Sequence, residues 1–158
     1  MVFIRAPERR AGLYAVRGHR VFGIRRHAVL GADVRLGERR FAARRTEDGW
    51  EIDGQPASPG TTEALDDLLD TLLGLRAVDV FRSQEVSSFG LEQPRATIEL
   101  LTARGAHRLL VGSLNSAGSA FYARHADDPR ILQIGTLLLT EIERVFYNRD
   151  GPGVARQG

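Results

Sequence analysis

The feature that most constrains the fold is one stretch of helical periodicity set between two long regions that alternate like β-strands. In residues 61–75 leucines recur at intervals of three and four, which places them on a narrow stripe of an α-helix. Thr61 or Thr62 is expected to cap the start of this helix, and Gly74 to end it. An amphipathic helix must bury its stripe against another element, and the flanking strands supply one. The pattern predicts an α+β fold.

Antiparallel strands are predicted on both sides of this helix. Residues 13–45 interleave apolar residues with arginines and are punctuated by glycines, as expected for short strands joined by tight turns. Asp48-Gly49 is a hairpin-turn signal, with Trp50 and Ile52 at alternate positions of the returning strand. Further strands are expected at residues 76–81, 95–102, 107–111, 120–125 and 130–134.

A second amphipathic helix closes the pattern. Leu138, Ile142 and Phe146 fall on one helical face, and Thr136 is a candidate cap. The predicted architecture is therefore antiparallel β-hairpins forming a twisted sheet, or two sheets, with two amphipathic helices packed on it. The predicted core consists of Trp50, Leu65, Leu69, Leu72, Phe89, Leu91, Ile98, Leu109, Phe121, Ile134, Ile142 and Phe146.

The segment Phe89-Gly90-Leu91, followed by Pro94, lies between two predicted strands. Gly90 permits a positive φ, which would let the chain reverse there, so that Phe89 and Leu91 point inward. Pro94 fixes φ just before the next strand begins, where the missing N–H costs little. The segment brings few polar groups that could hold a ligand. We interpret it as a corner that docks two parts of the fold.

The length of 158 residues favours one domain, with or without a small extension, and is sufficient for a core without disulfides or metal. We expect a basic, strand-rich extension at residues 1–37, an α+β domain at residues 38–150 and a loose tail at residues 151–158. The absence of cysteine excludes thiolate metal sites and cysteine nucleophiles. No membrane-spanning helix or signal peptide is predicted, and the compartment is left open.

Charge is distributed unevenly, and arginine supplies every basic side chain. Residues 1–45 contain twelve arginines and three acidic residues, a net charge of +9, whereas the remainder contains ten arginines and seventeen acidic residues, a net charge of −7. The basic part could bind an acidic protein, anionic lipid or nucleic acid. The simpler interpretation, which we favour, is a set of solvated strand faces that the acidic part of the same molecule partly neutralises. The candidate interaction surface comprises Arg17, Arg20, Arg25, Arg26, Arg39, Arg40, Arg44 and Arg45.

No pattern predicts a catalytic residue, a cofactor or a metal site. The four histidines are scattered, although a strand fold could bring His107 and His125 together. Asp127-Asp128-Pro129 is interpreted as a hairpin tip. The Gly/Ser-rich residues 111–121 lack a phosphate-loop motif and precede a strand, not a helix. The sequence therefore favours a protein without enzymatic activity.

An ordered set of short motifs over about residues 38–150 resembles a bacterial family. The set comprises Gly49-Trp50, the helix near 61–75, Phe89-Gly90-Leu91 with Pro94, Val111-Gly112, and Tyr122-Ala123-Arg124. It is similar to a domain-of-unknown-function family found in cell-envelope proteins, many of them encoded beside gliding-motility-type ABC transporter components. The resemblance implies a location in the cell envelope and carries no catalytic residue.

Together these observations predict a non-catalytic protein-interaction or scaffolding domain, an accessory subunit of a larger envelope or transport-associated assembly. The expected partners are other protein subunits, including those of a membrane-associated complex. The alternative is a binder of nucleic acid or an anionic membrane surface through the Arg-rich residues 1–45, which would show steep salt dependence. Nucleic acid is the weaker partner because no base-reading motif or stacking platform is evident. A small-molecule enzyme ranks third.

Overall fold

The computed structural model describes residues 19–77, 80–82 and 89–151. Two α-helices, α2 (Pro59–Gly74) and α3 (Leu137–Asp150), and the short 3-10 helix η1 (Arg26–Ala28) accompany the strands. The strands are β1 (His19–Arg20), β2 (Gly31–Leu36), β3 (Arg39–Thr46), β4 (Gly49–Ile52), β5 (Gln55–Pro56), β6 (Arg76–Ala77), β7 (Val80–Arg82), β8 (Ala96–Thr102), β9 (Gly105–Leu114), β10 (Phe121–His125) and β11 (Arg130–Ile134). The predicted α+β class is confirmed.

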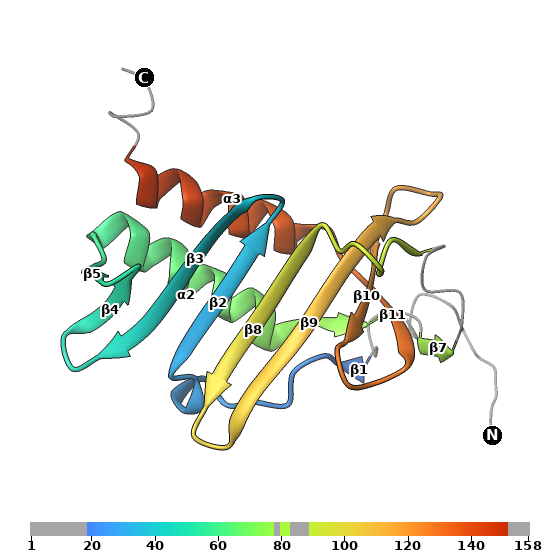
Figure 1. Cartoon of the computed structure of the whole chain (residues 1–158), viewed down its shortest axis with the longest axis horizontal. Helices are drawn as coiled ribbons and strands as arrows, with labels where there is room; N and C mark the ends of the chain where they lie inside the picture. The colour runs from blue at the N-terminus through green and yellow to red at the C-terminus, as the bar shows by residue number, and fades with distance from the viewer. Residues whose placement is uncertain (1–18, 78–79, 83–88, 152–158) are drawn as a thin grey trace.

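Nine of the strands in the described residues form one antiparallel sheet, in the order β5-β4-β3-β2-β8-β9-β10-β11-β7, while β1 pairs separately with β6 (Figure 1). Tight hairpins join most neighbours. Two neighbouring pairs join strands that are distant in sequence: β11 with β7 at one edge, and β2 with β8 at the centre. The pairing of β2 with β8 brings together segments on either side of α2 and places Val34 opposite Ile98. The predicted hairpins after residues 46, 102 and 125 are all present.

The position of β2 bears on the predicted domain division. Residues 31–36 pair on one side with β3 and on the other with β8, so they are an internal strand of the sheet. A boundary between residues 37 and 38 therefore falls in the turn between β2 and β3. Residues 1–18 of the predicted extension, and all but Gly151 of the predicted tail, lie outside the described residues. Within residues 13–45, η1 replaces a strand.

Both helices lie side by side on one face of the sheet, here called the inner face (Figure 1). Alternate residues of every long strand point toward them, for example Val34 in β2, Phe41 in β3 and Ile98 in β8, each at most 2% exposed. The leucine stripe of α2 and the stripe of α3 complete one continuous apolar core. Burial of this stripe explains why the period of α2 is so clear in the sequence.

The helix ends differ in detail from the prediction. Ser58, rather than Thr61 or Thr62, caps α2: its hydroxyl accepts a hydrogen bond from the backbone N–H of Thr61 at 3.1 Å. Pro59 occupies the first turn, where its missing N–H has no intrahelical partner to lose. The helix ends at Gly74, as predicted. Thr136 occupies the cap position of α3 but forms no side-chain capping bond.

The segment from Phe89 to Pro94, here called the corner, packs on the opposite, outer face of the sheet. Gly90 has a φ of +73°, as predicted, and a Cβ there would lie 2.2 Å from the hydroxyl oxygen of Ser113. A Cβ on Gly112 would lie 2.1 Å from the carbonyl oxygen of Phe89. Because both glycines lack side chains, the corner backbone can approach β9 this closely.

The two apolar residues of the corner have different environments. Leu91 is 4% exposed, as predicted, but it lies outside the main core cluster. Phe89, predicted as core, is only partly buried. Its ring packs edge-on against Tyr122 with centroids 4.7 Å apart, and Tyr122 alternates with the inner-face residues of β10. The expectation that Phe89 enters the core is wrong, because the corner lies on the outer face. The other eleven predicted core residues are buried.

Candidate interaction surface

Over β3, β2, β8 and β9 the outer face carries ion pairs between neighbouring strands. Arg44 donates from Nη1 to Asp33 Oδ1 at 2.7 Å, and Arg108 donates from Nη2 to Glu99 Oε2 at 3.2 Å. Asp33 and Glu99 stand opposite each other on β2 and β8, and Arg108 stands opposite Glu99 on β9. Charged residues thus follow one row across the sheet, and no described helix or strand covers them (Figure 1).

A second row contains the only close approach of two arginines in direct register on this surface among the described strands. Arg35 on β2 lies opposite Arg40 on β3. The guanidinium of Arg35 donates to the carbonyl oxygens of Gly37 and Pro94 and to the hydroxyl of Thr97. By contrast, the guanidinium of Arg40 has no hydrogen-bond or ion-pair partner within the described residues. One arginine is therefore fixed and the other is available.

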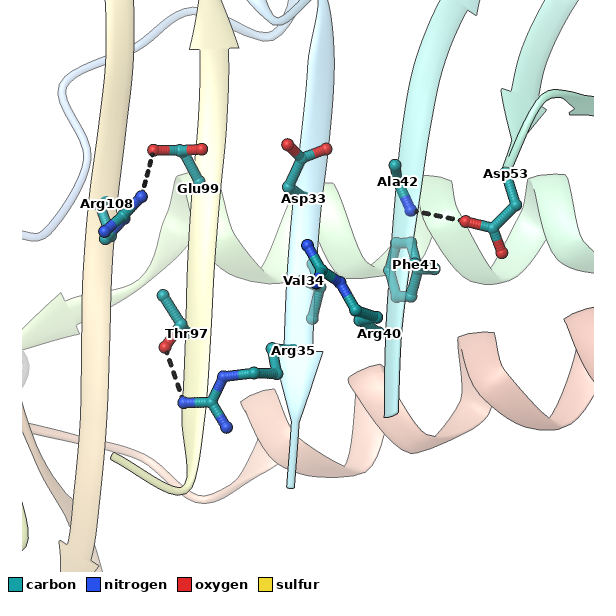
Figure 2. A pocket seen from close by; sticks show the side chains of 10 residues that line it. All are labelled: Asp33, Val34, Arg35, Arg40, Phe41, Ala42, Asp53, Thr97, Glu99 and Arg108. Carbon is teal, nitrogen blue, oxygen red and sulfur yellow. Dashed lines mark hydrogen bonds and ion pairs between the residues drawn. The ribbon is translucent and has the colours of Figure 1, made fainter. Parts of the chain in front are cut away.

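These side chains line a shallow depression of about 350 Å³ on the outer face (Figure 2). Figure 2 shows Arg40 reaching from β3 over β2, and Arg35 reaching in the same direction toward β8. Asp53 borders the depression beyond β3, where its carboxylate accepts from the backbone N–H of Ala42 at 3.0 Å. We call this surface the charged depression; its members are Asp33, Val34, Arg35, Arg40, Phe41, Ala42, Asp53, Thr97, Glu99 and Arg108.

The predicted arginine surface is divided between different parts of the molecule. Arg40 and Arg44 lie on the outer face, whereas Arg39 and Arg45 alternate with them and point toward the helix-bearing side. Arg25 is exposed beside η1. Arg20 donates to the carbonyl of Leu73, Arg26 contacts α2, and Arg17 lies outside the described residues. Whether any of them binds a partner stays a prediction.

Several of these arginines pair with the acidic residues of the helices. Arg26 contacts Asp66 and Asp70 of α2, and Arg39 contacts Glu143 of α3. The basic residues 1–45 and the acidic remainder of the chain thus neutralise each other in part across the fold. Pairs this exposed contribute about 0–1 kcal/mol each. Their main effect is to leave fewer positive charges for a partner.

The alternation of β3 could have located the charged depression. Phe41 is the large apolar residue of this strand and is buried, so alternation turns Arg40 and Arg44 toward the outer face. Arg35 and Arg108 were missed because they join this surface only through the pairing of β2 with β8 and of β8 with β9. The hydrogen bond to Asp33 raises the pKa of Arg44 above its ordinary value.

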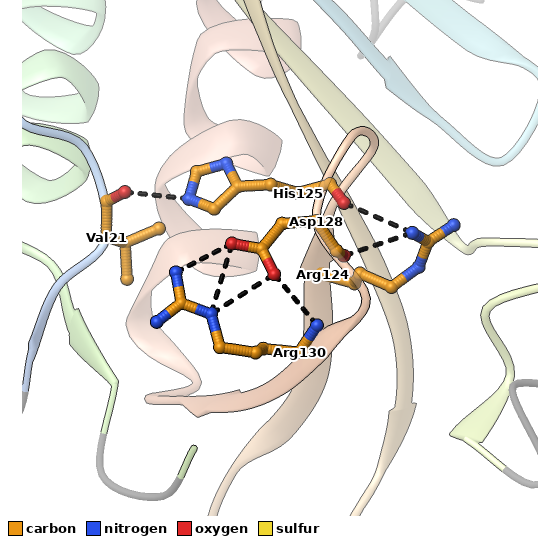
Figure 3. A network of polar contacts seen from close by, with 5 residues as sticks. All are labelled: Val21, Arg124, His125, Asp128 and Arg130. Atoms are coloured by element: carbon orange, nitrogen blue, oxygen red, sulfur yellow. Dashed lines mark hydrogen bonds and ion pairs between the residues drawn. The ribbon is translucent and has the colours of Figure 1, made fainter. Parts of the chain in front are cut away.

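The remaining sequence candidates for chemistry have structural partners. His125 places Nε2 2.8 Å from the carbonyl oxygen of Val21, and its ring packs edge-on against Phe22 (Figure 3). His107 and His125 line one shallow depression, but no three metal-ligating side chains gather within the described residues. The Gly/Ser-rich loop between β9 and β10 is held by Asn115, whose Oδ1 accepts a hydrogen bond from the backbone N–H of Ser119.

The Asp127-Asp128-Pro129 segment is a hairpin tip, as predicted. The carboxylate of Asp128 accepts from the backbone N–H and the guanidinium of Arg130 (Figure 3). These hydrogen bonds lower the pKa of Asp128 well below its ordinary value. Arg124 donates from Nη1 to the carbonyl oxygens of His125, Ala126 and Asp128 and so closes the same turn. These contacts stabilise the turn between β10 and β11.

The fold and the site define an α+β domain in which two helices cover one face of an antiparallel sheet while part of the other face carries exposed charges. The chain belongs to the family described as domain of unknown function DUF4340, whose sequence model matches residues 50–144, more than half of the chain. Comparisons with curated proteins and with solved structures gave no significant match. Among the described residues, neither helix has the length and apolar character needed to cross a membrane.

Proposed function

We propose that this protein is a non-catalytic interaction or scaffolding domain that docks a protein partner on the charged depression. The observation that carries the proposal is the outer-face arginine Arg40, which projects over an uncovered part of the sheet without a partner of its own. Around it, Asp33 and Glu99 are already engaged by Arg44 and Arg108. The surface therefore offers the guanidinium of Arg40 as a free hydrogen-bond donor beside two ion pairs that are already formed.

The chemistry of this surface suits a polar protein contact. A guanidinium presents donors in a planar fork that can pair with two carboxylate oxygens, and arginine is enriched at interfaces. The neighbouring charges would select a partner by complementarity, because a like charge placed opposite any of them is costly. We infer that the partner places a carboxylate over Arg40 and polar groups over the adjoining ion pairs.

The setting of this contact is part of the proposal. The motif order that resembles the envelope family supports a role as an accessory subunit of a transport-associated assembly in the cell envelope, with ABC transporter components encoded nearby. In such an assembly the domain would hold subunits together and perform no reaction. Membership of the DUF4340 family is compatible with this role, but the family description names no function.

Binding of nucleic acid or an anionic membrane through residues 1–45 has less support. A polyanion requires several positive charges on one continuous surface. Among the described residues of this segment, Arg26, Arg39 and Arg44 are paired with carboxylates, and the outer-face arginines are interleaved with acidic side chains. A phosphate backbone passing over Arg40 would also meet Asp33 and Glu99.

Site-specific photo-crosslinking in the native cell tests the proposal. Replacing Ala42, which lines the charged depression beside Arg40, with p-benzoylphenylalanine puts the crosslinking group on this surface and keeps Arg40 in place. Replacing Glu63, which is on α2 with its side chain 74% exposed, puts the same group on a helix remote from it. We expect a discrete protein adduct from position 42 and none from position 63.

Two results would contradict the proposal. One is the absence of any adduct at position 42 while the protein is folded and present at its native level. The other is the same set of adducts from both positions, which would indicate random collisions. Crosslinking to nucleic acid or lipid from position 42 would favour the alternative function.

A further inference from the structure

A second concave surface lies at the end of the sheet, on the side opposite the charged depression. It is formed by the loop of residues 23–30, which includes η1, and by the turn between β8 and β9. His107 stands opposite Leu100, an inner-face residue of the core, so this part of the hairpin continues the helix-bearing side of the sheet. We call it the end groove; it is lined by Gly23, Ile24, Arg25, His27, Ala28, Leu30, Thr102, Ala103, Arg104 and His107.

The charge of the end groove is of one sign. Its ionisable lining residues are two arginines, Arg25 and Arg104, and two histidines, His27 and His107, with no acidic side chain among them. The guanidiniums of Arg25 and Arg104 have no hydrogen-bond or ion-pair partner within the described residues. This differs from the arginines near the helices, such as Arg26 and Arg144, which pair with carboxylates.

The floor of the end groove is apolar. Leu30 is 47% exposed although it directly precedes a central strand, and Ile24 is partly buried against the core. Exposed leucines beside unpaired positive charges could indicate either a protein contact or a membrane contact. The concave shape favours a protein, because a membrane-binding loop projects its apolar side chain outward into the lipid, whereas a groove receives a side chain from a partner.

The charge pattern also distinguishes between possible protein occupants. Residues 1–18 contain four arginines and one acidic residue, and residues 152–158 contain one arginine and no acidic residue, so both ends of this chain would be repelled. The acidic side chains of α2 in a second copy, Asp66, Asp67 and Asp70, are already paired with arginines. The charge of the groove is complementary to an acidic segment, and we take another protein as its source because neither end of this chain nor α2 of a second copy offers one.

We propose that the end groove binds an acidic segment of a partner protein, with an apolar side chain seated on Leu30 and carboxylates paired with Arg25 and Arg104. This site goes beyond the contact at the charged depression and depends on different residues. A scaffold with one contact on each side of its sheet can hold two partners at once. Neither contact needs the other to form.

The full-length chain and a short fluorescein-labelled peptide of glutamate and leucine residues test this proposal. We expect the peptide to bind in a fluorescence-anisotropy titration and to shift the amide NMR signals of residues 23–30 and 102–107. The double variant Arg25→Gln/Arg104→Gln should bind about tenfold more weakly, as expected when two charged interface groups are lost. Leu30→Ser should also weaken binding.

Matched controls locate the effect. Arg95→Gln/Arg130→Gln removes the same charge from exposed positions elsewhere and should change the affinity by less than about twofold. Arg40→Glu should leave peptide binding intact, which separates this site from the charged depression. A peptide with lysine in place of glutamate should not bind.

The proposal is overturned if the amide shifts fall elsewhere at saturating peptide, or if none appears at high peptide concentration. An equal loss of peptide affinity in the two double variants would mean that only the net charge of the protein matters, and this result would also overturn the proposal. Phosphatidylglycerol vesicles provide the last comparison. If they bind through Arg25 and Arg104 and displace the peptide, the groove serves a lipid surface and the proposed protein segment is wrong.

Discussion

One half of the outer face is covered by another segment of the chain, whereas the other half is exposed. Over β9 and β10 the corner packs onto the sheet, with its backbone against Gly112 and the ring of Phe89 against Tyr122. Over β3, β2 and β8 the same face carries ion pairs and the unpaired guanidinium of Arg40. The first half is completed by the chain itself. The second half is not covered by any described helix or strand, so another molecule could contact it.

The difference has an energetic consequence. Close approach of two backbones tolerates no added atom, because neither backbone can move without disturbing a strand. Exposed ion pairs contribute little to folding and can be changed at small cost. We therefore expect substitutions in the covered half to reduce stability, and substitutions in the open half to affect association.

The largest loss of stability is expected for Gly90→Val. A β-branched residue is strained at a φ of +73°, and its Cβ would overlap the hydroxyl oxygen of Ser113. Together these effects should lower the free energy of unfolding by about 3 kcal/mol, measured by urea denaturation. An unchanged midpoint would mean that the corner does not hold Gly90 in this conformation.

Gly112→Ala should cost somewhat less, about 2 kcal/mol. Its backbone conformation accepts a side chain, but the new methyl group would lie 2.1 Å from the carbonyl oxygen of Phe89. The matched control is Gly135→Ala, where a Cβ meets no atom within 4 Å. Thermal melts should separate the two variants clearly. Equal melting temperatures would show that the corner is not docked on β9.

Arg40→Glu should change the free energy of unfolding by less than about 0.5 kcal/mol, because its guanidinium has no partner to lose within the described residues. Urea denaturation of this variant beside Gly112→Ala compares the open and covered halves directly. A loss comparable with that of Gly112→Ala would indicate that the open half is also needed for folding.

A pH-dependent effect is expected at the hairpin tip, for Asp128→Asn. Hydrogen bonds from Arg130 lower the pKa of Asp128 from the ordinary value of 3.8. A carboxyl group with a lowered pKa stabilises the fold above its unfolded pKa and loses that contribution as the pH falls through the folded value. The difference in melting temperature between wild type and variant should be constant above about pH 5 and shrink below pH 3.8. If the difference in melting temperature grew as the pH fell, the pKa of Asp128 would have to be raised in the folded state, which would contradict the prediction.

The elements of this fold could be predicted because their signals are local. The leucine stripe of α2 and the turn residues around Gly49 and Gly105 depend on neighbours a few positions away. The cap of α2 was predicted at the wrong residue although a local signal existed, since Ser58 precedes a proline suited to the first helical position. Phe89 was misplaced because its sequence does not say which face the corner covers.

The candidate site was less predictable because it depends on pairing between distant segments. The sequence drew attention to the arginines of residues 1–45, but alternation along β3 sends Arg39 and Arg40 to opposite sides. The charged depression then requires β2 to meet β8, across the whole of α2 in sequence. No local pattern specifies that pairing. The ion pairs of Arg26 and Arg39 could not be predicted either, because their acidic partners lie on helices that are distant in sequence.

The most direct test of the central claim is the fraction of this protein retained in its native complex when Arg40→Glu replaces the wild type in the cell. Gly135→Ala serves as the control, and both proteins are compared at equal folded levels. The account predicts that Arg40→Glu melts like wild type and is recovered mainly outside the complex. Recovery of Arg40→Glu in the complex at the wild-type level would contradict the account, because the open half of the outer face would then have no role in assembly.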